Sequence, residues 1–306
     1  MIVYRELSSL VSDLGFSEKT LYSVSNNTSA HYKSVQLPKG SGDFRDLSVP
    51  DKLLKAIQKQ INDVLLPLEP ISPYATAYRP GGCTRVNAAP HVGKPMLLKL
   101  DIRHFFDNII FPLVKRKAFP AERYSEQNRI LLTILCTHYD TLPQGAPTSP
   151  AITNIIMRDF DNSVGRWCSQ RHISYTRYCD DMTFSGDFEP AMVISFVKNE
   201  LHTMGLFLNE RKTTIVRSDK RQCVTGIVVN EKTSIPKEYK RKIRQEMYYC
   251  LKYGLSSSME KKKVQISNDE YMASLLGRIN YVLSVEPDNQ EMLGYRDTVK
   301  QMANVC

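Results

Sequence analysis

Hydrophobic and polar positions along the chain follow two different periods, which predict helices and strands in turn. Residues 51–66 carry apolar side chains at helical spacing, so we expect a helix there. Residues 96–102 form a mostly apolar run that includes Asp101 near its end, which predicts a buried strand whose last residues emerge at a site. Residues 173–178 and 182–185 are rich in β-forming side chains on either side of a short turn, and they predict a hairpin.

Other segments extend this mixed pattern. A glycine-containing turn within residues 37–47 is expected to join two strands. Ser149 and Pro150 predict the cap and first turn of one helix with an apolar face over residues 152–164. A further helix, over residues 193–204, is expected to stop at Gly205, and short β-rich runs follow at 206–208 and 223–229. Beyond about residue 232 the spacing is helical throughout, so we expect an α/β body followed by an all-helical module.

Composition is that of a folded protein in a reducing compartment. The chain has 306 residues, of which 42% are hydrophobic, enough for a full core. No apolar run reaches the roughly 18 residues of a membrane-spanning helix, and the first residues lack a secretory pattern, so we expect no membrane partner. The seven cysteines are scattered without a C-x-x-C pair, which argues against zinc and disulfides and predicts a cytoplasmic location.

Charge points to a polyanionic partner. The net charge is +9 and the isoelectric point is near 9.1. The distribution is more informative, because residues 237–263 hold nine lysines and arginines against three glutamates. Such a stretch is either a surface that binds nucleic-acid phosphates or an ordinary solvated helix face, and charge alone does not decide between them.

Two acidic positions predict metal-dependent chemistry. Asp180 and Asp181 follow Tyr178 and Cys179 at the tip of the predicted hairpin, where two carboxylates repel each other. Asp101 lies at the end of the predicted buried strand. If the strands are neighbours, three carboxylates converge at one end of a sheet and can hold two Mg²⁺ ions, which prefer oxygen ligands. Taken singly, an Asp-Asp turn is common, and Asp101 is explained equally well as a strand-terminal or helix-capping acid.

These motifs together resemble a known family. Asp101 followed by Phe105 and Phe106, then residues 144–150 (Gln-Gly-Ala-Pro-Thr-Ser-Pro), 178–181 and 205–213, resemble the successive catalytic motifs of reverse transcriptases, in the family's order. Asn87-Ala-Ala-Pro-His91 and Val224-Thr225-Gly226 are similar to two elements of bacterial retron reverse transcriptases. The resemblance covers roughly residues 37–230, with a weaker helical match beyond. Cys179 departs from the Ala of many relatives, and we expect it to add sensitivity to oxidation.

The resemblance implies a role for each of several residues. The catalytic set is Asp101, Asp180, Asp181 and Lys212, the last as proton donor to pyrophosphate, and the metal set is Asp101, Ile102, Asp180 and Asp181. The nucleotide-binding set is Lys39, Arg45, Phe106, Gln144 and Gly145, with Phe106 excluding a ribose 2′-hydroxyl. The RNA-binding set is Asn87, His91, Lys240, Arg241 and Arg244. Each role has a plain structural alternative. Lys39 and Arg45 could be solvated charges of an exposed hairpin, and Phe106 could be a core aromatic, as we expect for Phe105. Lys212 could be an ordinary exposed lysine, and His91 could satisfy a loop carbonyl.

The resemblance also implies a fold and an activity. The fold is α+β, a right-hand polymerase fold with fingers at 1–95, a palm of antiparallel sheet and helices at 96–232 (112–146 partly fingers), and a small all-helical thumb at 233–306.

The implied enzyme copies a cognate structured non-coding RNA, which is both template and primer, into single-stranded DNA. It starts from an RNA 2′-hydroxyl, uses dNTPs and two Mg²⁺ ions, and holds an RNA–DNA duplex. An accessory effector protein and a role in anti-phage defence are also implied. The alternatives are a group II intron-like reverse transcriptase with a 3′-hydroxyl primer and a catalytically idle RNA-binding scaffold.

Overall fold

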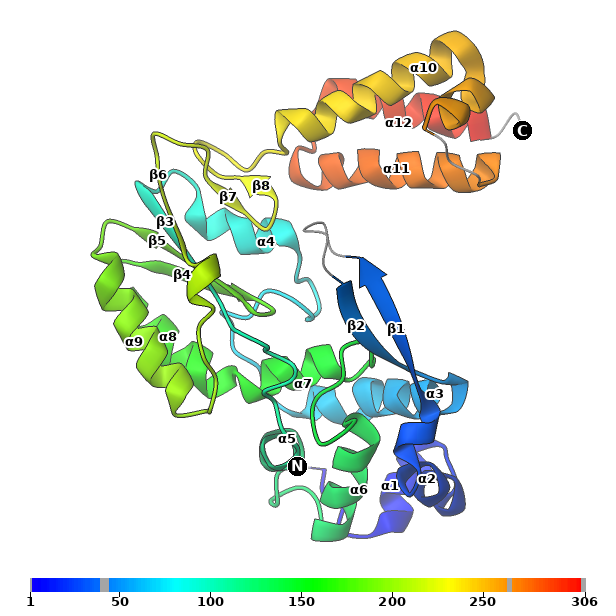
Figure 1. Ribbon diagram of the computed structural model, residues 1–306, viewed down its shortest axis with the longest axis vertical. Coiled ribbons are helices and arrows are strands. Elements are labelled where there is room, and N and C mark those ends of the chain that lie inside the picture. Colours follow the sequence, from blue (N-terminus) through cyan, green and yellow to red (C-terminus); the bar gives the residue numbers. More distant parts are fainter. Residues whose placement is uncertain (1, 39–43, 263–265, 304–306) are drawn as a thin grey trace. The chain divides into compact units, whose positions relative to one another are not determined.

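The computed structural model describes residues 2–38, 44–262 and 266–303 and divides the chain into two compact units (Figure 1). The first unit consists of Met1–Gly82 with Leu98–Ile215, and the second of Cys83–Leu97 with Val216–Cys306. The residue boundaries expected from the sequence for fingers, palm and thumb differ from those of the two units, and they stay a prediction.

The first unit is built on a four-stranded sheet in the order β4-β5-β3-β6. Its strands are β3 (Met96–Asp101), β4 (Ser174–Tyr178), β5 (Asp181–Gly186) and β6 (Thr214–Arg217). Strands β4 and β5 are antiparallel, with Tyr178 opposite Asp181, so the predicted hairpin is confirmed. The predicted buried strand is confirmed as β3, and it lies next to β5, as the convergence of the three aspartates requires.

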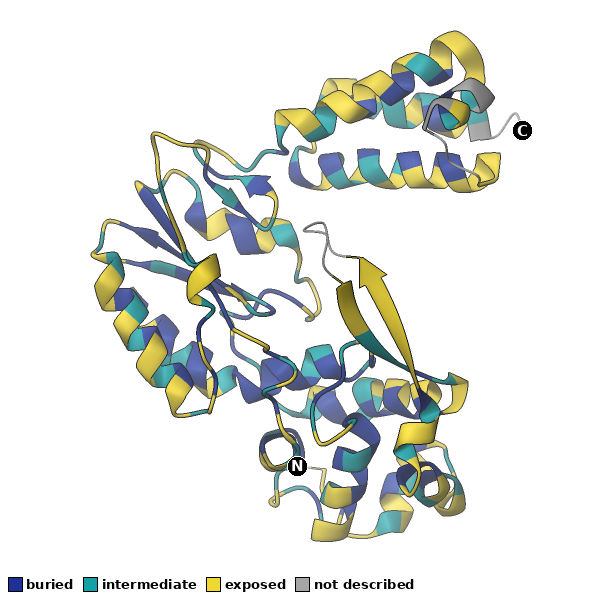
Figure 2. Cartoon of the chain, viewed as in Figure 1, coloured by how far each residue is buried: buried dark blue, intermediate teal, exposed yellow. Residues whose placement is uncertain are grey.

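Helices and a second hairpin complete this unit. Its helices are α1 (Leu7–Leu14), α2 (Glu18–Ser25), α3 (Lys52–Gln60), α5 (Phe111–Ala118), α6 (Glu126–Cys136), α7 (Ser149–Ile156), α8 (Arg158–Ser169) and α9 (Pro190–His202). Asp51 caps α3 by accepting a hydrogen bond from the Leu54 N–H. The predicted strand pair around residues 37–47 is confirmed as β1 (Tyr32–Pro38) and β2 (Phe44–Pro50), which are antiparallel and mostly exposed (Figure 2).

Four local predictions were wrong. The helix expected over residues 149–164 is two helices, α7 and α8, which meet at Met157. The α7 cap position is Thr148, and the Ser149 hydroxyl donates instead to the Pro143 carbonyl at 2.7 Å. The helix expected to reach residue 66 leaves α geometry at Ile61–Leu65. Residues 206–208 form no strand, since only Leu208 bridges to Ile102, and β6 was not anticipated.

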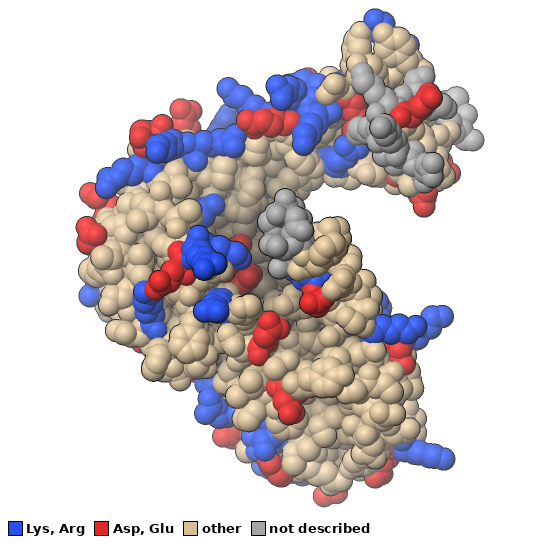
Figure 3. Space-filling model, viewed as in Figure 1, with Lys and Arg blue, Asp and Glu red and all other residues tan. Residues whose placement is uncertain are grey.

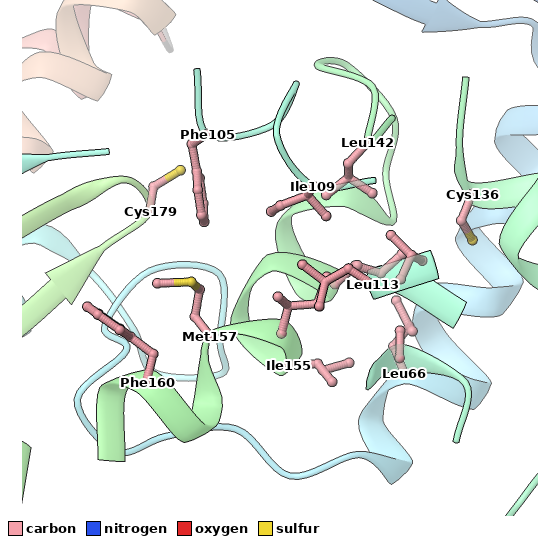
Figure 4. Packing of buried hydrophobic residues seen from close by; sticks show 14 of the residues in the cluster. Leu66, Phe105, Ile109, Leu113, Cys136, Leu142, Ile155, Met157, Phe160 and Cys179 are labelled. Carbon is pink, nitrogen blue, oxygen red and sulfur yellow. The ribbon is translucent and has the colours of Figure 1, made fainter. Parts of the chain in front are cut away.

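The core of the first unit lies between the sheet and its helices. Figure 4 shows the part near the turn that carries Cys179, where Phe105, Met157 and Phe160 belong to one buried cluster. Phe105 is 3% exposed, which confirms the prediction of a core aromatic. This packing fixes the backbone on both sides of the acidic positions.

The second unit is mainly helical. It contains α4 (Thr84–Ala88), the small hairpin β7 (Cys223–Val224) and β8 (Ile227–Val228), and the helices α10 (Lys237–Lys262), α11 (Asn268–Val285) and α12 (Gln290–Ala303). Residues beyond 232 are therefore helical as predicted. Gly254, with φ of +83°, interrupts α10, so this element is two helices in sequence. Ile243, Met247, Leu275 and Ile279 are among the residues of its core. None of the helices that the structure describes is long and apolar enough to cross a membrane.

Candidate active site

The turn between β4 and β5 carries the two adjacent aspartates to the end of β3. Cys179, between Tyr178 and Asp180, has φ of +60°, a left-handed conformation that closes the turn. The backbone N–H of Ile102 donates to the carbonyl of Asp180 at 3.1 Å, which joins the end of β3 directly to the turn. Asp101 itself is 5% exposed. The sheet thus brings the three predicted carboxylates to one place.

Electrostatics show that the three carboxylates interact. The pKa of Asp181 is raised to about 6, first by loss of hydration within the cleft and then by the charges of Asp180 and Asp101. The Asp181 side chain still reaches water at the cleft surface. Lys212 Nζ donates to Asp101 Oδ2 at 2.7 Å, and this hydrogen bond is the main cause of the raised pKa of Lys212. The lysine stays protonated beside the carboxylates.

The donor set fits a hard divalent cation by its chemistry. Carboxylate oxygens that repel one another are the ligands that Mg²⁺ and similar ions favour. Asp101, Asp180 and Asp181 supply such oxygens, and Ile102 can offer its backbone oxygen. Within the described ranges, however, no group of three or more His, Cys, Asp or Glu side chains is already arranged to hold an ion. Lys212, in its ion pair with Asp101, adds positive charge at this place.

A cleft of about 800 Å³ opens over these residues. Its lining includes Asp101, Ile102, Asp180, Asp181, Lys212, Arg45, Phe106 and Gln144 of the predicted site. Lys39 lies outside the described residues. The structure therefore brings most of the predicted catalytic and nucleotide-binding residues to one cavity of the first unit, and their individual roles stay predictions.

Gly145 lies against β2, whereas its neighbour Gln144 lines the cleft. Its φ is +121°, and a Cβ atom there would lie 2.9 Å from the carbonyl oxygen of Ser48 in β2. The Ser48 N–H donates to the carbonyl of Gln144 at 2.8 Å. Glycine is needed here because the backbone of this loop approaches β2 closely. The expected nucleotide contact of Gly145 stays a prediction.

The predicted RNA-binding residues lie in the second unit and differ in exposure. Asn87 and His91 are 1% and 0% exposed, and Asn87 Nδ2 donates to the Thr225 hydroxyl at 3.3 Å. Burial lowers the pKa of His91 to about 3, so the ring is neutral. In this conformation neither side chain can contact RNA directly. Any contribution to recognition would act through the chain segments that they support.

Two of the three predicted RNA-binding residues of α10 are paired with acids of the same unit. Lys240 contacts Glu286 at 2.8 Å and Arg244 contacts Glu291 at 2.6 Å, whereas Arg241 is exposed and has no ion pair within the residues that the structure describes. Figure 3 shows basic and acidic side chains intermixed over this helix. The cations available to a phosphate backbone are therefore fewer than the sequence count indicates.

Two residues of the site were missed by sequence reasoning. Tyr78 lines the cleft, is 49% exposed and has φ of +54°. Arg177 is completely buried beside the turn. A tyrosine in a loop gives no signal in sequence, and an arginine in a strand predicts a surface position. Only the partners of these residues in the folded chain distinguish them.

Burial argues against the expected oxidation sensitivity of Cys179. The residue is 8% exposed, and loss of hydration is the main cause that raises the pKa of its thiol to about 12. The reactive thiolate is consequently scarce at neutral pH.

Comparison with known proteins agrees with this geometry. Residues 37–296 match the family model described as reverse transcriptase (RNA-dependent DNA polymerase). The Mx65 retron reverse transcriptase of Myxococcus xanthus is 30% identical, over 87% of this chain and 64% of its own length. The Ec83 and Ec86 retron enzymes of Escherichia coli are 31% and 29% identical, over 86% and 82% of this chain and 86% and 74% of their own lengths.

The chain belongs to the reverse transcriptases, a family of RNA-directed DNA polymerases, and within them to the bacterial retron enzymes. This membership confirms the predicted α+β right-hand polymerase fold with fingers, palm and helical thumb. Dependence on a divalent metal goes with the family. Among solved structures, apo telomerase from Candida tropicalis is similar with a TM-score of 0.49 and 14% identity, over 67% of this chain and 55% of that chain.

Proposed function

We propose that this chain copies a structured non-coding RNA into single-stranded DNA and begins from a 2′-hydroxyl of that RNA. The observation that carries the catalytic part is the convergence of Asp101, Asp180 and Asp181 in a cleft that Arg45, Phe106 and Gln144 also line. The similarity to several retron reverse transcriptases supports the RNA partner and the branched product. The proposal includes a cytoplasmic location, an accessory effector protein and a role in anti-phage defence.

The residues of the cleft divide the chemistry among them. Asp101, Asp180 and Asp181, with the backbone of Ile102, would hold two Mg²⁺ ions. When bound, these ions would neutralise the developing charge and activate the attacking hydroxyl. Arg45 would bind the triphosphate, and Phe106 would exclude a ribose 2′-hydroxyl. Because its raised pKa keeps Lys212 protonated, Nζ can donate a proton to the departing pyrophosphate as the bond from the α-phosphorus breaks. Gln144 and Gly145 would position nucleotide and template.

Nucleic-acid binding would use the second unit. Arg241, with Lys240 and Arg244 where their acidic partners release them, would contact phosphates of the RNA–DNA duplex. Such contacts displace counterions, so affinity for a template–primer should fall as salt rises. A slope of log affinity against log salt near zero would contradict the assignment of these residues to phosphate binding.

The decisive experiment is co-expression of the protein with the non-coding sequence that flanks its coding region. Total nucleic acid is separated on a denaturing gel, with the variant Asp180→Asn/Asp181→Asn as control. A short discrete DNA that needs both aspartates and shifts after RNase or debranching-enzyme treatment is the expected result. Extension of ordinary primed templates without such a DNA would indicate a 3′-primed reverse transcriptase. Absence of both activities would leave an RNA-binding scaffold.

A further inference from the structure

A completely buried arginine lies directly beneath the acidic turn. Arg177 is in β4, three residues before Asp180, and has 0% exposure. Its Nε donates to Asp161 Oδ1 at 2.8 Å and its Nη2 to Asp161 Oδ2 at 2.6 Å, a two-pronged contact with α8. Asp161 also has 0% exposure and accepts a hydrogen bond from the Tyr175 hydroxyl at 2.8 Å.

The other guanidinium N–H groups reach the turn and α7. Nη1 donates to the carbonyl of Cys179 at 2.8 Å, the left-handed residue immediately before Asp180. Nη2 also donates to Asn154 Oδ1 at 3.2 Å. A left-handed residue other than glycine is strained, and it persists where surrounding contacts hold it. The bond to the Cys179 carbonyl is such a contact.

The same network supports the segment that carries Tyr78. Asn154 Nδ2 donates to the carbonyl of Ala77 at 2.8 Å. The Arg177 N–H donates to the carbonyl of Tyr74, and its own carbonyl accepts from the Thr76 N–H, each at 2.9 Å. One residue therefore connects the turn and the segment at 74–78, both of which contribute to the cleft, with α7 and α8 behind them.

Stability alone does not account for this arrangement. A buried ion pair can often be replaced by apolar side chains of similar volume without loss of stability. An apolar side chain at position 177 could fill the space but could not donate to the Cys179 carbonyl. The arginine is therefore specifically suited to holding the turn.

We infer that Arg177, oriented by Asp161 and Asn154, is a positioning residue that sets Asp180, Asp181 and Tyr78 relative to Asp101. It acts through the backbone of the turn and does not touch substrate. The inference rests on the proposed function, because it assumes that the turn binds metal ions.

The test compares two variants with wild type. Arg177→Lys keeps the positive charge but loses the planar fork, and Arg177→Met/Asp161→Leu removes the ion pair as a whole. Arg171→Lys is the matched control, since Arg171 is exposed and contacts the Trp167 carbonyl and ring away from the cleft lining. Three quantities are measured: the melting temperature, the binding of Tb³⁺ to the free protein by tyrosine-sensitised luminescence, and kcat and KM for single-nucleotide addition to a primed RNA.

For Arg177→Lys we expect Tb³⁺ affinity and kcat to fall by about 10–100-fold, as on loss of outer contacts at other metal sites, while the KM for dNTP changes little. For the double variant we expect a melting temperature close to that of wild type, with Tb³⁺ binding and kcat still reduced. Two results would overturn the inference. One is wild-type Tb³⁺ binding and kcat in the double variant, and the other is unchanged Tb³⁺ binding and kcat in Arg177→Lys.

Two further results separate the possible failures. If either Arg177→Lys or Arg177→Met/Asp161→Leu is unfolded at the assay temperature, the folded variant tests the positioning role. If both are unfolded, Asn154→Ser, which leaves the ion pair in place, provides the test. If wild type neither adds nucleotides nor binds Tb³⁺ in a manner sensitive to Asp180→Asn/Asp181→Asn, the proposed function fails. A wild type that does both, with variants that are equally active, would refute only the positioning role.

Discussion

Two ion pairs flank the acidic turn, at nearly equal distance but in opposite surroundings. Arg177 and Asp161 are 2.6 Å apart with both side chains fully buried, and Lys212 and Asp101 are 2.7 Å apart with the lysine side chain 61% exposed. The buried pair cannot separate without leaving a charge unsolvated, so it is part of the framework. In the second pair only Asp101 is buried, and the exposed lysine can exchange this carboxylate for water or a substrate group. Burial, and not distance, distinguishes the framework contact from the reactive one.

The largest expected effect comes from breaking the buried pair on one side. Arg177→Met leaves Asp161 buried without a counter-charge, so we expect the free energy of unfolding to fall by about 3–5 kcal/mol. Adding Asp161→Leu should restore most of the loss. Urea unfolding of both proteins measures this. A loss below about 1 kcal/mol, the usual value for an exposed pair, would erase the contrast between the two pairs.

The pair with the exposed lysine should affect catalysis more than stability. We expect Lys212→Gln to lower the free energy of unfolding by less than Arg177→Met does, because the lysine is solvated and Asp101 lies at a cleft, although that carboxylate is itself buried. Nucleotide addition should slow by about 10²–10⁴-fold, the usual contribution of a positioned acid. Rapid-quench kinetics and urea unfolding supply the two numbers. Lys198→Gln, which breaks a comparable 2.6 Å contact with Glu210, is the control and should leave catalysis unchanged.

His91 tests the same principle for a neutral buried group. Its pKa is about 3 in the folded protein and ordinarily near 6.5, so the unfolded chain binds the extra proton between these values. The burial of neutral His91 therefore costs no stability above pH 6.5. As the pH drops from 6.5 toward 3, the free energy of unfolding falls by at most about 1.4 kcal/mol per pH unit. Between pH 7.5 and 5.0, wild type should lose about 2 kcal/mol more than His91→Gln in urea unfolding. Identical pH dependence in both proteins would show that folding does not lower the pKa of His91.

The smallest effect concerns paired and unpaired cations on α10. Arg241→Gln should reduce the slope of log affinity against log salt by about 0.7–0.9, the value for one phosphate contact. Arg244→Gln should change the slope less, because Glu291 already compensates its charge. Fluorescence anisotropy of a labelled RNA–DNA hybrid across a KCl series gives both slopes. Equal changes in the two variants would mean that Arg244 exchanges Glu291 for phosphate on binding.

The sequence predicted those parts of the fold that depend on local pattern. The buried strand β3 and the hairpin of β4 and β5 followed from hydrophobic runs and a turn, and the helical region beyond residue 232 followed from its spacing. The break between α7 and α8 at Met157 was not predictable, since the apolar spacing continues across it. Strand β6 was missed because it is short and partly exposed, so its pairing is set by the sheet.

The site divides in the same way. Asp101, Asp180 and Asp181 carry a sequence signal only in combination, because each is an ordinary acid on its own, whereas a predicted strand end and hairpin tip that bring three carboxylates together indicate a cation site. Arg177 and Asp161 carry none, since charged residues in strands and helices are ordinarily solvated and their 16-residue separation matches no short motif. The burial of Asn87 and His91 was equally hidden, because it depends on packing between segments far apart in sequence.

The close contact at Gly145 limits how this enzyme can be engineered. A library aimed at altered nucleotide preference can vary Phe106 and Arg45, whose side chains face the open cleft. Position 145 has to stay constant, because any side chain there would push against the Ser48 carbonyl in a backbone conformation that other residues avoid. Randomising residues 144–146 as a block would therefore yield mostly inactive clones, and tolerance at Gln144 is best sampled alone.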